Sequence, residues 1–157
     1  MPGRSAAVLV VLLLVGACTA SPETTPEPAG FADALPGPKM ELQVVEAPGL
    51  GEVLADHQQF TLYRYEQDET DPPRSTCVAL DCTLKWVPLM AAEVQRTTGF
   101  DAGLLGIVDR PEGTKQVTLN GHPLYRYVDD EQAGDAKGDG LGGVWFAVGP
   151  RGEKARG

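Results

Sequence analysis

Apolar and polar residues alternate in short runs along the chain after residue 40, and this period predicts β-strands rather than long helices. Turn residues separate the runs, and Asn120-Gly121 is the strongest of these signals because both residues tolerate a positive φ. Residues 84–90 are expected to begin as a helical turn, and residues 91–99 to form a polar linker or short helix. The pattern predicts strands at 40–44, 53–55, 60–65, 104–108, 115–119, 122–127 and 144–148.

One phrase with this alternation occurs twice. Leu62-Tyr63-Arg64-Tyr65-Glu66-Gln67-Asp68 returns as Leu124-Tyr125-Arg126-Tyr127-Val128-Asp129-Asp130, and both copies read Y-x-Y-x-x-D. Because alternate residues of a strand share a face, the two tyrosines of each copy point one way, and the leucine and the arginine point the other way. Tyrosine suits a half-buried pleated surface, so each copy is predicted to be the central strand of one half of a duplicated domain.

Asp68 and Asp130 follow the tyrosines of each copy, just beyond the expected end of the strand. At this position an aspartate accepts backbone N–H bonds in a turn or a hydrogen bond from a tyrosine hydroxyl. We favour a structural interpretation, in which the rings pack in the core and the carboxylates close turns. The alternative is that the tyrosines and aspartates bind a ligand or form a redox site.

The two halves also share a longer order of features, namely a hairpin, the phrase, a polar loop and then a tryptophan, Trp86 or Trp145. This order predicts a mostly β fold in which two antiparallel repeats, about residues 50–90 and 104–149, share one core. We expect a single small sandwich or barrel-like domain over residues 40–149, because neither half is large enough to fold comfortably alone. Residues 150–157 are expected to fray.

The N-terminal segment carries an export signal. Residues 6–15 are an uninterrupted apolar run that is too short to span a bilayer, which needs about 20 residues, but fits a secretory signal. The run ends in Val15-Gly16-Ala17-Cys18, which resembles the lipobox of bacterial lipoproteins. The resemblance implies that residues 1–17 are removed and that acylated Cys18 binds membrane lipid at the outer face of the cell membrane. Residues 18–39 are predicted to be a disordered tether.

Two further cysteines, Cys77 and Cys82, lie close together in the sequence. With Cys18 acylated, these two are left to pair with each other, and a disulfide is the usual state of such a pair in an exported protein. We expect a local structural disulfide, and the alternative is a redox-active pair.

Several further blocks of sequence match a known pattern. Besides the two phrases, they are 75–77 with Cys82, 86–89, 110–118, 120–125 and 134–146. Over about residues 50–149 the chain is similar to the bacterial lipoprotein family catalogued as a secreted repeat of unknown function, whose motif is Y-x-(F/W/Y)-x-x-D. The cysteines are one residue further apart than in that pattern, and Val87 replaces a proline. The resemblance implies export and a lipoprotein anchor, and it brings no catalytic residues.

The net charge of −9, with dispersed acidic residues, argues against a nucleic-acid partner. The sequence lacks the nucleophile, phosphate-loop and zinc-protease motifs of common enzymes. We therefore expect a non-enzymatic module that binds a small ligand, an envelope polymer or a protein partner, with no metal and no cofactor. One alternative is an extracytoplasmic redox or electron-transfer accessory in which His57 and His122 help to bind a metal or haem. Another is an enzyme that acts on envelope glycans with paired carboxylates.

Overall fold

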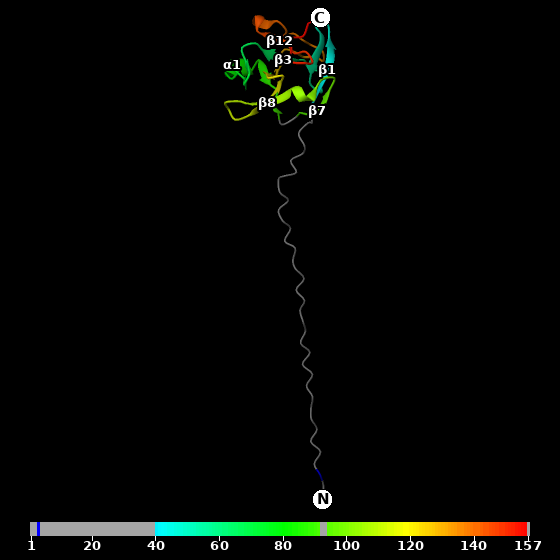
Figure 1. The fold of residues 1–157 in the computed structure, drawn as a ribbon, viewed down its shortest axis with the longest axis vertical. Helices are drawn as coiled ribbons and strands as arrows, with labels where there is room; N and C mark the ends of the chain where they lie inside the picture. The colour runs from blue at the N-terminus through cyan, green and yellow to red at the C-terminus, as the bar shows by residue number, and fades with distance from the viewer. Residues whose placement is uncertain (1–2, 4–39, 92–93, 157) are drawn as a thin grey trace. The chain divides into compact units, whose positions relative to one another are not determined.

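The computed structural model describes Gly3, residues 40–91 and residues 94–156. The predicted tether and Cys18 lie outside these residues, as does all of the predicted signal peptide except Gly3. The described part is mostly β (Figure 1). Its elements are β1 (Met40–Ala47), β2 (Gly51–Ala55), β3 (Leu62–Tyr65), β4 (Glu69–Thr70), β5 (Pro73–Arg74), α1 (Leu80–Thr83), β6 (Trp86–Pro88), β7 (Val94–Thr98), η2 (Ala102–Leu104), β8 (Leu105–Asp109), β9 (Lys115–Leu119), β10 (His122–Pro123), β11 (Tyr125–Tyr127), η3 (Leu141–Gly143) and β12 (Trp145–Ala147).

The two tyrosine phrases form β3 and β11, which pair antiparallel at the centre of a four-stranded sheet with the order β12-β3-β11-β6. Tyr63 lies opposite Tyr125 in this register. On the outer sides, Trp145 of β12 lies opposite Tyr65, and Trp86 of β6 lies opposite the second tyrosine of β11. Each half therefore pairs its tryptophan strand with the tyrosine strand of the other half, so the two halves are interwoven about a pseudo-twofold axis.

Each half also supplies a hairpin beside the central sheet. In the first half β1 pairs antiparallel with β2 and parallel with β7, which gives the order β2-β1-β7. In the second half β9 lies between β8 and β10. Hydrogen bonds from Leu54 N to Val148 O and from Val117 N to Leu89 O attach the hairpins to the chain just after β12 and β6. Within residues 40–91 and 94–156, none of the sheets closes into a barrel.

Both halves contribute to the hydrophobic core, as the sequence predicts. Because alternate strand residues lie on opposite faces, the central sheet has a leucine face and an aromatic face. The buried cluster on the leucine face consists of Leu42, Leu54, Leu62, Leu89, Val117, Leu119, Leu124 and Val148. The cluster on the aromatic face consists of Ala47, Val53, Tyr63, Cys77, Trp86, Tyr125, Trp145, Ala147 and Ala155.

Three local predictions differ from the structure. Residues 94–98 form β7 rather than a linker or short helix, because pairing with β1 satisfies their backbone and their β-branched residues suit a strand. The strand predicted to end at Val44 continues to Ala47, because it pairs with β2 over this stretch. The helical turn α1 lies before residues 84–90 and includes Cys82.

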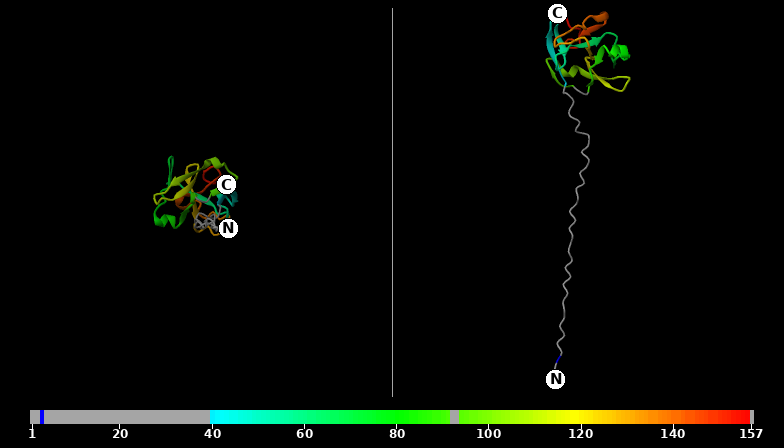
Figure 2. Two further views of the ribbon diagram at one scale, coloured as in Figure 1. Left: turned by 90° about the horizontal axis from the view of Figure 1, so that it is seen from below. Right: turned by 180° about the vertical axis from the view of Figure 1, so that it is seen from behind.

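The predicted frayed tail is instead packed over its described residues, 150–156. Figure 2 shows the C-terminal segment in red beside the β1–β2 hairpin in cyan. Ala155 N donates to Ala147 O over 2.8 Å, and Val148 pairs with Lys154 in an isolated bridge. Arg64 Nη1 donates to Gly152 O over 2.7 Å. These backbone and side-chain bonds, rather than the position at the end of the chain, decide the order of this segment.

Candidate functional site

The hydroxyl of the first tyrosine in each phrase is hydrogen-bonded to the aspartate of the other phrase. Tyr63 Oη donates to Asp130 Oδ2 over 2.6 Å, and Tyr125 Oη donates to Asp68 Oδ2 over 2.7 Å. Both tyrosines are fully buried, and both aspartates are also buried. These four residues are named the tyrosine–aspartate lock. Its two bonds are related by the pseudo-twofold axis, and each joins one half of the domain to the other.

The second carboxylate oxygen of each aspartate closes the loop that follows it. Asp68 Oδ1 accepts hydrogen bonds from Thr76 N over 2.7 Å and from Thr76 Oγ1 over 2.9 Å. Asp130 Oδ1 accepts one from Lys137 N over 2.9 Å. The two roles that the sequence left open for the aspartates are therefore both present, since each carboxylate accepts a tyrosine hydroxyl and a backbone N–H.

A buried arginine lies beside one half of the lock. Arg110 is 3% exposed, and its Nη1 donates to Ser75 Oγ and Gln116 Oε1, each over 2.7 Å. Its Nη2 donates to Cys77 O over 2.9 Å, and its Nε pairs with the Glu112 carboxylate. The guanidinium charge is thus compensated by one carboxylate and by neutral oxygens, as a buried cation requires.

This arginine is connected to the lock through a serine. Ser75 Oγ lies 2.6 Å from Tyr125 Oη. Because the Tyr125 proton is donated to Asp68, the Ser75 hydroxyl is the donor to Tyr125. A chain of donors therefore runs from Arg110 through Ser75 and Tyr125 to Asp68.

Burial shifts the titration of the lock residues. It raises the pKa of Tyr63 and of Tyr125, and the hydrogen bond to Asp130 and the charge of Asp68, respectively, raise these pKa values further. Burial also raises the pKa of Asp68 and of Asp130, against the hydrogen bonds that they accept. The phenols therefore hold their protons well above neutral pH, and this is the state in which they donate to the carboxylates.

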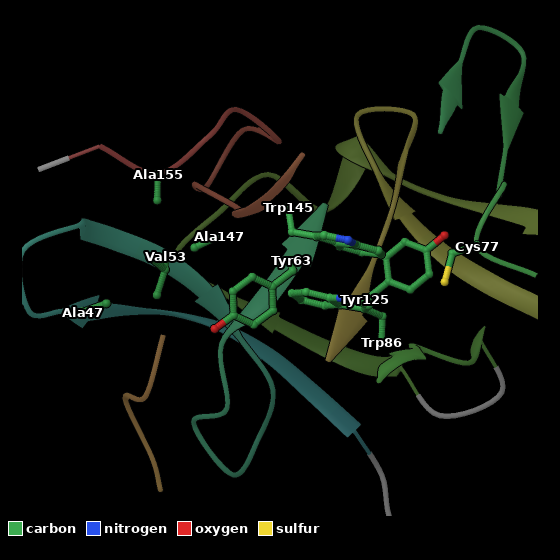
Figure 3. Packing of buried hydrophobic residues seen from close by; sticks show 9 residues of the cluster. All are labelled: Ala47, Val53, Tyr63, Cys77, Trp86, Tyr125, Trp145, Ala147 and Ala155. Atoms are coloured by element: carbon green, nitrogen blue, oxygen red, sulfur yellow. The ribbon is translucent and has the colours of Figure 1, made fainter. Parts of the chain in front are cut away.

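The second tyrosine of each phrase and the two tryptophans form a continuous stack of four rings. Tyr65 stacks on Trp145 with a centroid distance of 4.1 Å, Trp145 on Trp86 at 3.8 Å, and Trp86 on Tyr127 at 4.4 Å. Figure 3 shows the two indoles face to face between Tyr63 and Tyr125. Each lock tyrosine meets one indole by its edge, at 5.4 Å for Tyr63 and Trp86 and at 5.1 Å for Tyr125 and Trp145.

The ends of this stack reach the surface. Tyr65 and Tyr127 are half-buried, and their hydroxyls donate to Gln67 Oε1 and to Asp129 Oδ2, each over 2.7 Å. The hydrogen bond to Asp129 raises the pKa of Tyr127. The four motif tyrosines are thus divided by depth, with the first of each pair in the core and the second at its margin.

Two local features pack against the aromatic cluster. A Cβ at Gly138 would lie 2.8 Å from Tyr63 Cε1 and 2.9 Å from Trp86 Cη2, so only glycine lets the loop over residues 129–143 approach so closely. The predicted disulfide between Cys77 and Cys82 is present, and Cys77 is buried in the same cluster. The disulfide is therefore part of the core.

The structure places the two histidines in different environments. His57 is exposed in the turn between β2 and β3, whereas His122 is half-buried at the start of β10. Burial, with the positive charge of Arg64 nearby, lowers the pKa of His122 to about 4, so its ring is neutral at neutral pH. In the described part of the chain, no three His, Cys, Asp or Glu side chains are grouped so that they could hold a metal ion.

Sequence reasoning gave no role to Arg110, Ser75 and Gln116, which the structure places around the lock. Gln116 and Thr118 alternate with Val117 and Leu119, a pattern that ordinarily marks a solvent face, yet residues 116–119 are buried throughout. The only available signal was that Ser75, Arg110 and Gln116 lie in the blocks that match the family pattern.

The interwoven sheet and the reciprocal lock define an internally duplicated β-domain. The chain belongs to the family described as a secreted repeat of unknown function, whose model matches it twice, over residues 45–90 and 106–149. The two matches contain the two phrases and their tryptophans, so the family resemblance and the duplication are confirmed, and the family places the protein outside the cytoplasm. No curated protein and no solved structure matches the chain. Among the described residues, no helix has the length and apolar character needed to cross a membrane.

Proposed function

We propose that this protein is a lipid-anchored, non-enzymatic module of the cell envelope that binds an extended segment of another envelope protein. The observation that carries this proposal is the outer edge of β8, which pairs with no strand among residues 40–91 and 94–156 and has apolar surface beside it. The tyrosine–aspartate lock supports the non-enzymatic part of this proposal, because its hydroxyls and carboxylates are used in hydrogen bonds within the domain.

The duplication itself indicates what fits the edge of β8. In the first half, the outer edge of β1 is covered by β7, which pairs with it at four positions. In the second half, β8 ends its sheet in the order β10-β9-β8. Within the part of the chain that the structure describes, the equivalent edge thus carries a strand in one half and is open in the other. A strand added by a partner would give β8 the neighbour that β1 already has.

Side chains along β8 favour an apolar partner strand. Ile107 in the middle of β8 is 59% exposed. Two cavities of about 400 and 480 Å³ open beside it, and both are lined by Ile107 and Ala91. Leu105 and Val117 line the first cavity, and Met90 lines the second. In strand addition the backbone supplies affinity and such pockets select alternate side chains, so the expected occupant is an extended segment with apolar residues at every second position.

The test uses the full chain and peptides selected from a displayed random library. Binding should protect the backbone amides of residues 105–109 from hydrogen exchange, because an added strand takes up the free edge of β8. Ile107→Asp should abolish binding, and Leu80→Asp should not, although Leu80 on α1 is even more exposed, at 71%.

Protection confined to another surface, or equal loss of binding in the two variants, would contradict the proposal. Protection of residues 105–109 that rises with protein concentration in the absence of peptide would instead identify a second copy of the chain as the occupant.

A further inference from the structure

The four-ring stack has a geometry that suits the movement of an electron as well as packing. Its neighbouring rings lie nearly parallel, with interplanar angles of 13° for Tyr65 and Trp145, 5° for the two indoles, and 29° for Trp86 and Tyr127. Indole and phenol are the protein side chains that lose a single electron most readily. Rings that touch face to face are electronically coupled, so a radical formed on one indole is shared with, or passes to, its neighbours.

The two ends of the stack differ in the group that could accept a proton. Oxidation of a phenol becomes favourable when the hydroxyl proton leaves together with the electron. Tyr127 Oη donates to a carboxylate oxygen of Asp129, which is able to take that proton, whereas Tyr65 Oη donates to the amide oxygen of Gln67, which is not basic. Because Asp129 stands where the first phrase has Gln67, an electron is lost more readily from Tyr127 than from Tyr65, so the oxidised end of the stack is Tyr127.

A surface cavity lies at the same end. Tyr127 lines a cavity of about 230 Å³ together with Phe60, Val87, Arg126, Val128 and Asp130. The Arg126 guanidinium lies over the Phe60 ring at 4.5 Å from its centroid, and its charge is paired with the Asp56 carboxylate at 3.3 Å. Because the cavity opens at the Tyr127 ring, a small one-electron donor could reach that ring here.

The lock tyrosines do not offer an equivalent end point. Tyr63 and Tyr125 also donate to carboxylates, but they meet the indoles by their edges and at longer distances than the stacked pairs. Both are fully buried, so a radical formed on either ring has no access to an external donor.

We propose that the stack is a path for one-electron oxidation that begins at the Trp86–Trp145 pair and ends at Tyr127. This role is independent of the binding role of β8.

An oxygen-centred radical takes one electron from the indole pair and is reduced to its anion. The indole radical then takes an electron from Tyr127, whose hydroxyl proton moves to Asp129 Oδ2. The result is a neutral phenoxyl radical at the surface, a protonated Asp129, and a restored indole pair. An external one-electron donor of the ascorbate type then reduces the phenoxyl radical, which regains its proton from Asp129.

Pulse radiolysis of the purified full chain with the azide radical, which oxidises indole first, tests this path. The absorption of the indole radical should decay into that of a phenoxyl radical with a first-order rate that does not depend on protein concentration. Tyr127→Phe keeps the stacked ring and should remove most of the phenoxyl yield, whereas the matched variant Tyr65→Phe should retain it. Asp129→Asn should slow the conversion about 100-fold, the lower end of what a positioned proton acceptor contributes.

A gain-of-function variant sharpens the test. Gln67→Asp gives Tyr65 the same acceptor two residues away that Tyr127 has, and in the Asp129→Asn background it should restore phenoxyl formation, now on Tyr65. Near-ultraviolet circular dichroism checks that the stack is intact in each variant. A wild-type protein that forms no phenoxyl radical, or a Tyr127→Phe variant with unchanged yield, would overturn the proposal, since in the second case the radical resides on the buried tyrosines.

Discussion

At the scale of single residues, the repeated motif is explained by the bonds between its members. The first tyrosine and the aspartate of a phrase do not bond to each other but to their counterparts in the other phrase. A hydrogen bond to a charged group contributes about 1.5–3 kcal/mol, and a buried carboxylate that loses its donor also keeps its desolvation cost. Each phrase therefore needs the other in order to be stable.

Removal of one lock hydroxyl measures this dependence. Tyr63→Phe leaves Asp130 Oδ2 without its donor in a buried site and should lower the free energy of unfolding by about 1–3 kcal/mol. The control is Tyr65→Phe, which removes a hydroxyl of the same strand that bonds at the surface, and it should change stability by no more than about 0.5 kcal/mol. Urea unfolding of both variants provides the comparison, and equal effects would show that the lock adds nothing specific.

Alkaline pH should also weaken the lock. The folded-state pKa of Tyr63 and of Tyr125 lies above the unfolded value, so their contribution is complete below about pH 10 and falls as the pH rises further, when only the unfolded chain releases the protons. Each phenol should lower the unfolding free energy by about 1.4 kcal/mol per pH unit above that point. Urea titrations at increasing pH should show a slope that is smaller by this amount in Tyr63→Phe, and an unchanged slope would contradict the shift.

At the scale of elements, the packing of short strands depends on the loops that cover them. The loop that follows each phrase is held by the second oxygen of the lock aspartate, and the first of these loops leads into the Cys77–Cys82 disulfide and α1. The disulfide lies against the aromatic cluster, and the carbonyl of Cys77 accepts a hydrogen bond from Arg110. The disulfide therefore fixes both a core side chain and the carbonyl group that accepts a hydrogen bond from the buried arginine.

Loss of this crosslink should destabilise the domain and leave its location unchanged. For the short loop that the disulfide closes, chain entropy predicts a loss of about 2 kcal/mol in Cys77→Ser or Cys82→Ser. Thermal unfolding measures the loss, and membrane fractionation of the same cells checks that attachment is retained. Free thiols at both positions in the exported wild-type protein would show that the crosslink does not form in the cell.

At the scale of the whole molecule, the interwoven sheet makes the folded domain a single unit. Each tryptophan strand is separated from its own tyrosine strand and pairs with that of the other half. The domain is mostly β and carries a disulfide, which agrees with its membership of a family of secreted repeats. Attachment to the membrane is a separate prediction, which rests on the lipobox resemblance of the N-terminal segment.

The anchor is tested at a single position. Cys18→Ser removes the thiol that the lipobox resemblance marks for acylation, so the protein should move from the membrane fraction to the medium or the periplasm. The stability of the β-domain should not change, because the substitution lies outside residues 40–156. A variant that stays in the membrane fraction would contradict acylation at Cys18.

The amino-acid sequence by itself determined the strand content, the duplication, the face on which each motif residue lies, and the Cys77–Cys82 pair. These features follow from local physics, since strand period, turn residues and cysteine spacing act over a few neighbouring positions. The resemblance of the two phrases was sufficient to identify the family.

Only the tertiary structure decided which residues of the two phrases bond to each other, and which polar residues accompany them. Tyr63 and Asp130 are 67 residues apart, and Ser75 and Tyr125 are 50 apart, so no local pattern couples them. The same reason applies to β7. Residues 94–98 look polar and unstructured when read locally, and their order comes from β1, far away in the sequence, whose free backbone groups they satisfy. Residues 150–156 fold back on residues 147–149 nearby, and the side chain of Arg64, 88 residues away, holds the carbonyl of Gly152.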